Sequence, residues 1–101
     1  MDNQLVVTAL ITERDLVRYT PAGLPIVNAT LQHSSQQTEA GIQRLAEFEI
    51  PAVAAGEISS RFSQAPLGGL YQFTGFLNKK SRNSKSLVFH IIDFRLLDTG
   101  A

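Results

Sequence analysis

Four basic side chains lie close together in the last third of the sequence and are its strongest candidates for a binding chemistry. They are four of the nine Lys and Arg residues and fall within seven positions: Lys79, Lys80, Arg82 and Lys85. No acidic residue lies between Ile58 and Ile92, whereas the remainder of the chain has four basic residues against nine acidic ones. Fixed cations at this density bind phosphates and release condensed counterions. The alternative is a solvated hairpin tip whose lysines only maintain solubility.

Other chemistry-bearing residues do not combine into a catalytic or metal site. Glu47 and Glu49 share one face of a predicted strand, but the sequence places no nucleophile or pocket beside them. His33 and His90 have no cysteine or regularly spaced carboxylate as a neighbour, so we expect hydrogen-bonded strand residues and not metal ligands. Cysteine is absent from the chain. We therefore expect a binding protein that is not an enzyme and needs no cofactor.

The composition is that of one small globular domain covering residues 1–101. The chain is 44% hydrophobic and 18% charged, which is typical of a folded domain and not of a disordered one. The N-terminal stretch Met1–Gln4 lacks the basic and apolar regions of a signal peptide, and no apolar run approaches the roughly 20 residues that cross a bilayer. We expect a soluble, cytoplasmic protein without membrane contact.

Alternating apolar residues predict five strands and no helix longer than one turn. The predicted strands are Leu5–Ile11, Ile26–His33, Leu45–Val53, Leu70–Leu77 and Leu87–Leu97. The segments between them are a turn at 20–25, a mobile polar loop at 34–41, an irregular stretch at 54–69 and the basic loop at 79–86. Strand alternation also predicts that only one of Lys79 and Lys80 faces a ligand.

Five short strands in about 100 residues favour an all-β, five-stranded Greek-key barrel, the OB-fold. In that fold the loop between the fourth and fifth strands borders a ligand, and this is where the basic loop lies. Gly75 predicts a bulge or a close backbone approach, and a change of apolar phase near Ile92 and Asp93 predicts a bend or a bulge.

Aromatic residues in these strands are predicted to form the core. We expect Phe48, Phe89, Ile91 and Phe94 to be buried. Phe73 and Phe76 lie in opposite phases of one strand, so one belongs to the core and the other to a binding face or a dimer interface.

Six stretches of the sequence resemble one known family. They are Asn3–Val6, Thr20–Pro25, Leu31–His33, Gln37–Gly41, Ile50–Pro51 and Ile92–Asp98. Together they are similar to the primosomal replication protein N (PriB) family, which is related to bacterial single-stranded-DNA-binding proteins. The resemblance implies a homodimer of OB-folds without catalytic activity that binds single-stranded DNA at stalled replication forks. It also implies two protein partners, a restart helicase (PriA-like) and then a helicase-loading protein (DnaT-like).

The resemblance also implies a set of DNA-contacting residues. Arg44 matches a DNA-contacting arginine of the family, and the basic loop stands where the family has DNA-binding lysines. Strong DNA binders of the family have aromatic rings at the positions of Ile42 and Glu47, so this chain lacks two stacking platforms worth roughly 1–3 kcal/mol per base. Glu47 and Glu49 would also repel phosphates. We expect weak, strongly salt-dependent binding.

Arg18 in the first loop is a further candidate for DNA contact. The alternative is a local ion pair in which Arg14 and Arg18 flank Asp15.

Two other functions remain open at this point. One is a general single-stranded-DNA-binding protein that coats DNA as a tetramer, and the other is an OB-fold adaptor that binds protein only. For the homodimer, an exposed strand near Leu5–Thr8 is the predicted contact across the two-fold axis.

Overall fold

The computed structural model describes residues 2–97 and contains six strands and one helix. In chain order they are β1 (Leu5–Arg14), β2 (Arg18–Tyr19), β3 (Pro25–Glu39), β4 (Ile42–Ala55), α1 (Glu57–Gln64), β5 (Leu70–Lys79) and β6 (Leu87–Leu96). Asp98, the last residue of the C-terminal family motif, lies outside the described residues.

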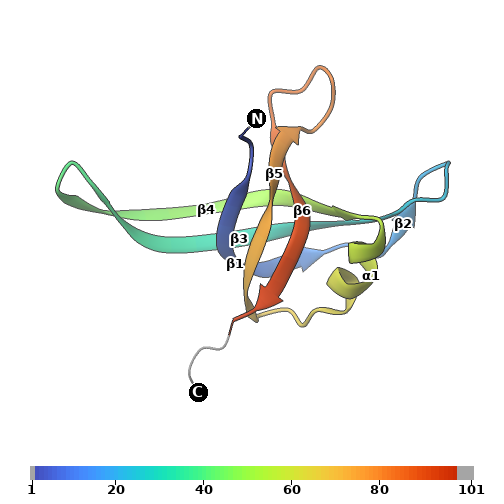
Figure 1. Ribbon diagram of the computed structural model, residues 1–101, viewed down its shortest axis with the longest axis horizontal. Coiled ribbons are helices and arrows are strands. Elements are labelled where there is room, and N and C mark those ends of the chain that lie inside the picture. The colour runs from blue at the N-terminus through green and yellow to red at the C-terminus, as the bar shows by residue number, and fades with distance from the viewer. Residues whose placement is uncertain (1, 98–101) are drawn as a thin grey trace.

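The sheet closes on itself and confirms the predicted OB-fold barrel (Figure 1). Its strand order is β1-β5-β6-β4-β3, and β1 pairs with β3 to close the ring. Only β4 and β6 run parallel, and the other main neighbours are antiparallel. The two-residue β2 is an additional strand on the outer edge of β3 that the sequence did not predict. A long β1 serves both sides of the closure, because Leu5–Leu10 pairs with β5 and Leu10–Arg14 with β3.

The core consists of alternate residues from each main strand and one residue of the helix. Phe62 of α1 and Phe73 of β5 are fully buried and both pack against Phe94, with ring centroids 5.6 and 5.9 Å away. Phe89 and Ile91 are also buried, so the core predictions for these two and for Phe94 are confirmed. Burial of these aromatic rings contributes hydrophobic free energy to the stability of this small barrel.

The prediction for Phe48 is wrong. Its side chain is 45% exposed and stacks on His33 across the β3–β4 pair, with 4.9 Å between the ring centroids. The alternation of apolar residues is present, but the barrel ends near the pair Leu31 and Ile50, and beyond it no second layer covers the strands. Ala46 and Ile50, which have the same phase as Phe48 in β4, are half-buried.

The polar segment predicted as a mobile loop at 34–41 is a strand and a turn. Residues 34–39 continue β3 and pair with β4 in unbroken register as far as Glu39 and Ile42. Ala40 and Gly41 form the turn, both with positive φ. The prediction failed because residues exposed on both faces of a two-stranded ribbon need no apolar alternation. We call residues 32–49 the arm, which projects from the barrel (Figure 1).

The segment predicted as irregular contains an eight-residue helix, α1. It is anchored by buried Phe62, and by Ser59, whose hydroxyl donates to the carbonyl of Gly56 at 2.6 Å. Arg14 donates to the carbonyls of Phe62 and Ala65 at the end of the helix. Arg14 therefore does not form the alternative ion pair with Asp15, because the carbonyl groups at a helix C-terminus carry a partial negative charge that attracts a cation.

Gly75 lies at the predicted irregularity of β5. The register of β5 and β6 shifts between Thr74 and Gly75, so Ile92 has no partner, which is consistent with the expected bulge. A β-carbon on Gly75 would lie 1.9 Å from the carbonyl oxygen of His90. Only glycine therefore permits this close approach of the two strands.

Candidate nucleic-acid interface

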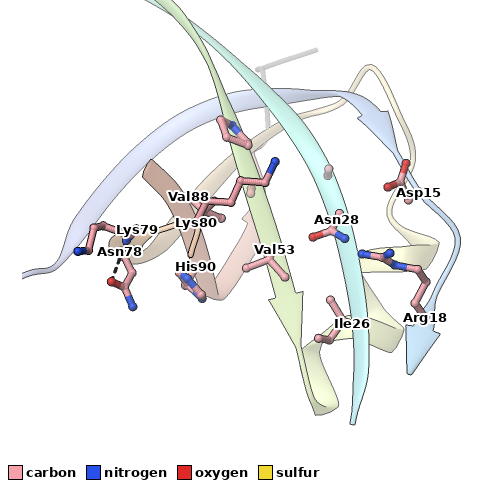
Figure 2. Close-up of a pocket in the computed structure, with 13 residues that line it drawn as sticks. Asp15, Arg18, Ile26, Asn28, Val53, Asn78, Lys79, Lys80, Val88 and His90 are labelled. Atoms are coloured by element: carbon pink, nitrogen blue, oxygen red, sulfur yellow. Dashed lines mark hydrogen bonds between the residues drawn. The ribbon is translucent and has the colours of Figure 1, made fainter. Parts of the chain in front are cut away.

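A hollow on the outer surface of the barrel has a volume of about 560 Å³. Its thirteen lining residues are Asp15, Arg18, Ile26, Asn28, Ala29, Pro51, Ala52, Val53, Asn78, Lys79, Lys80, Val88 and His90 (Figure 2). They belong to the strands β2, β3, β4, β5 and β6, to the loop before β2 and to the start of the basic loop. An apolar floor with cations at its borders can accept bases below and phosphates at the rim.

Cations lie on two opposite borders of this hollow. Figure 2 shows Lys79 and Lys80 at one side and Arg18 at the other, with Val53 between them. Asp15 is the only acidic residue among the lining residues and lies on the side of Arg18. The net positive charge of the rim favours a polyanion that crosses from one border to the other.

Both lysines at the strand end line the hollow, and Figure 2 shows their side chains pointing to opposite sides. That only one of them faces a ligand therefore stays a prediction. Strand alternation ends at Lys79, since β5 ends there and the backbone N–H of Lys80 already donates to Ser86 across the loop at 2.9 Å. The ammonium of Lys79 donates to the carbonyl of Arg82 at 3.2 Å. The N–H of Ser84 donates to Ser81 at 3.1 Å. These bonds preorganise the basic loop, and none of them pairs a cation with a carboxylate.

The cations of the hollow and the basic loop have no carboxylate partner within the described chain. Residues 2–97 contain two ion pairs, Arg44 with Glu39 at 3.2 Å and Arg61 with Asp93 at 2.6 Å. Arg18, Lys79, Lys80, Arg82 and Lys85 take part in neither, and all five are exposed. Their charges are therefore available to a ligand.

Arg44 is the one predicted contact residue that does not lie with the others. It belongs to the arm near the β3–β4 turn, is absent from the lining of the hollow, and its Nε pairs with Glu39. Arg82 and Lys85 lie in the basic loop beside the hollow but do not line it. The structure thus brings Arg18 to the two lysines and leaves Arg44 on another element.

The sequence analysis missed His90, Asn28 and Asn78 as lining residues. His90 was expected to be a hydrogen-bonded strand residue, but its ring stacks on Phe76 with centroids 4.7 Å apart and planes within 2°. By contrast, His33 is hydrogen-bonded as expected, to the carbonyl of Thr8 and the hydroxyl of Ser35. The signal for His90 was its phase, opposite to the buried residues of β6.

Metal-ligand clusters and membrane-spanning helices are absent from residues 2–97. No three His, Cys, Asp or Glu side chains in this range are grouped so that they could hold a metal ion. Within the same range, no helix is long and apolar enough to cross a membrane.

Sequence comparison finds a family of nucleic-acid-binding proteins. The model of a family described as "another single-strand binding protein family" matches residues 3–93. The replication restart protein PriB of Nitrosomonas europaea is 43% identical over 95 residues, which cover 94% of this chain and 88% of that protein. The protein of the same name from Bordetella pertussis is 37% identical, and the match covers 88% of this chain and 83% of that protein.

Comparison with solved structures finds a protein of the same name and a single-stranded DNA binding protein. The priB structure of Ralstonia solanacearum aligns with a TM-score of 0.87 and 40% identity, covering 97% of this chain and all of that one. A deletion mutant of the single-stranded DNA binding protein from Thermus aquaticus aligns with a TM-score of 0.74 at 21% identity, over 97% of this chain and 51% of that one. The second likeness shows the shared fold alone.

Proposed function

Because the chain belongs to the replication restart protein PriB family, which is related to the single-strand binding proteins, we propose that it binds single-stranded DNA in the hollow and acts in replication restart. The observation that carries this proposal is the pair of cationic borders, Arg18 on one side and Lys79 with Lys80 on the other. A binding function of this kind requires no catalytic residue.

The mode of binding follows from the lining. Phosphates contact Lys79 and Lys80, then Arg18, while Arg82 and Lys85 add attraction from the basic loop. Val53 lies between the borders and His90 lies beside the lysines, where its ring is held by its stack on Phe76. A base can lie against these side chains without sequence-specific hydrogen bonds.

We infer that this binding is weak and strongly dependent on salt. None of the thirteen lining residues is Phe, Tyr or Trp, so base stacking depends on one imidazole. Each missing aromatic platform forgoes roughly 1–3 kcal/mol. Phosphate contacts then supply most of the free energy, and salt weakens them.

A fluorescence-anisotropy titration with a labelled oligothymidine tests the proposal. Replacing Lys79, Lys80, Arg82 and Lys85 with alanine should weaken binding by more than about 30-fold at low salt. Lys80→Gln is compared with Arg95→Gln, which removes the same charge from β6 outside the hollow. We expect a loss for Lys80→Gln and little change for Arg95→Gln. Equal losses, or no binding by the wild type, would contradict DNA binding in the hollow.

The proposed role at the fork is to hold single-stranded DNA while contacting the restart helicase (PriA-like), so that the ternary complex is more stable than either pair. A helicase-loading protein (DnaT-like) follows in this sequence of contacts, which we place in the cytoplasm. Helicase affinity measured with and without oligonucleotide tests whether the two ligands share the hollow. If the helicase and DNA surfaces overlap, the two ligands compete and DNA is handed from one protein to the other. Saturation of the protein by helicase and oligonucleotide at the same time, without loss of affinity, would exclude this competition.

We propose that two copies associate through the free edge of β1. From Leu5 to Ala9, β1 pairs with β5 on one side, and its pairing with β3 begins only at Leu10. The other edge of this stretch has no strand partner in the described chain, and an unpaired edge favours pairing with a second strand. Antiparallel pairing of two β1 edges gives a symmetric dimer.

A further inference from the structure

The arm presents two faces, and one of them continues the surface of the hollow. Asn28 and Val53 are register partners and both line the hollow. Because successive side chains of a strand alternate between faces, every second residue outward from this pair lies on the same face. Along the arm these residues are Gln32, Ser34, Gln36 and Thr38 of β3, and Gln43, Leu45, Glu47 and Glu49 of β4.

This face of the arm lacks the groups that would bind single-stranded DNA. It contains no Lys or Arg and no aromatic ring, and its only charged residues are Glu47 and Glu49. Both carboxylates are exposed, and neither takes part in an ion pair within residues 2–97. Phosphates that followed the arm would approach two uncompensated negative charges.

The cation and the aromatic ring that the arm does possess lie on its other face. Arg44 is the register partner of Gln37, and Phe48 is the register partner of His33, two positions of the opposite phase. Arg44 is neutralised by Glu39 at 3.2 Å, and Phe48 is stacked on His33. Neither residue is available to a strand that leaves the hollow along the face of Glu47.

We propose that Glu47 and Glu49 mark the boundary of the DNA path. The strand crosses the barrel between the basic loop and Arg18 and does not continue onto the arm. This inference rests on the proposed function. It predicts a binding site at the short end of the roughly 4–16 nucleotides that one OB-fold occupies. On this proposal the two glutamates, together with the basic residues, determine how many nucleotides the protein binds.

The test uses the full chain and two labelled oligothymidines, about 6 and about 24 nucleotides long. The variant Glu47→Gln/Glu49→Gln keeps the size of both side chains, and both positions are exposed, so the fold should be unaffected. On the long oligonucleotide at about 50 mM salt we expect roughly 3- to 10-fold tighter binding than wild type. On the short one we expect a smaller gain, because it does not reach Glu47 and is affected only by Glu49, two residues from Pro51 of the hollow.

The single variants Glu47→Gln and Glu49→Gln are each compared with Glu57→Gln. This is the matched control, since Glu57 is an exposed glutamate of α1 that does not line the hollow. Equal gains for Glu57→Gln and Glu49→Gln would overturn the proposal, as would equal gains on the two oligonucleotides. Either result would mean that only net charge matters. If the wild type binds neither oligonucleotide while remaining folded, the proposed function itself fails.

Backbone NMR provides an independent readout with the wild type. Addition of the long oligothymidine should shift the amide resonances of Arg18, Asn28 and Lys80, which line the hollow. The amides of residues 34–47 should remain unshifted. Shifts that extend along the arm would overturn the proposed boundary even if the affinity data allowed it.

Discussion

At the scale of single residues, Gly75 shows how one position can decide the closure of the barrel. A β-carbon there would lie 1.9 Å from the carbonyl oxygen of His90, so β5 or β6 must move to accept it. We expect Gly75→Ala to lower the free energy of unfolding by about 3 kcal/mol. Urea denaturation followed by circular dichroism measures this change.

Gly41→Ala is the control for Gly75→Ala, because nothing lies within 4 Å of an added β-carbon at that turn. It has φ of 77°, so alanine there introduces left-handed strain alone, about 1–2 kcal/mol. A smaller loss for Gly75→Ala than for Gly41→Ala would contradict the packing argument.

His90 is the second residue whose role follows from its position. It lines the hollow and is held by Phe76. His90→Ala should weaken oligothymidine binding by about 1 kcal/mol, the low end of the range for a stacked base. The same titration at unchanged salt measures it. If His90→Ala changed the salt dependence of binding but left the affinity at low salt unchanged, His90 would act through charge and not through stacking.

The sequence predicts some residues of the site and misses others. Lys79, Lys80 and Arg18 are recognisable as exposed cations beside a predicted binding face, and the structure brings them to one hollow. His90 was not predicted, because its phase places it on the outer face of β6 but does not show that this face lines the hollow. Arg44 was predicted from family resemblance, and its distance from the hollow depends on how far the arm extends.

At the scale of elements, an ion pair connects α1 to β6. Arg61 of α1 donates to Asp93 of β6 at 2.6 Å and lies over the ring of Phe94, 4.5 Å from its centroid. The hydrogen bond from Arg61, with a second from the backbone N–H of Phe94, holds the pKa of Asp93 below its ordinary value of 3.8. The folded state thus favours the charged carboxylate.

This pKa shift gives a stability difference with a defined pH dependence. A carboxylate whose pKa is lowered on folding contributes stability above its unfolded pKa of 3.8 and loses it as the pH falls through the folded value. Asp93→Asn should lower Tm slightly near neutral pH, since the pair is exposed. The difference from wild type should vanish in acid below the folded pKa.

Thermal unfolding of both proteins across this pH range is the measurement, with Glu49→Gln as a control that breaks no ion pair in the described chain. A difference for Asp93→Asn that persists unchanged in acid would show that the side chain acts through packing and not through its charge.

Element boundaries were the least predictable part of the fold. The strands of the barrel alternate between a core and an outer face, and this pattern predicted all five. The arm has no core face, so its polar residues at 34–39 were taken for a loop. In α1 only Phe62 and Ser59 are buried, too few to show a helical period in the sequence.

At the scale of the whole molecule, the unpaired edge of β1 predicts how two copies meet. Val6 is 59% exposed on this edge, so a charged side chain there is tolerated by the monomer. In a symmetric dimer the two copies of one residue lie near the axis, and Val6→Lys would bring two cations together. We expect the dimer dissociation constant to rise by about 10-fold or more.

Leu16→Lys is the matched control, since Leu16 is 89% exposed in the loop between β1 and β2. Analytical ultracentrifugation distinguishes the outcomes. A monomeric wild type would contradict the dimer, and a Val6→Lys variant as dimeric as Leu16→Lys would place the interface elsewhere.

The central claim is that unpaired cations around the hollow hold single-stranded DNA. The most direct measurement is the slope of log K against log salt concentration for oligothymidine binding. With Arg18 and the four cations of the basic loop in contact, we predict a slope of about −3 to −4, reduced to about −1 when the basic-loop cations are replaced with alanine. A wild-type slope near zero, or one that the replacement leaves unchanged, would contradict the account.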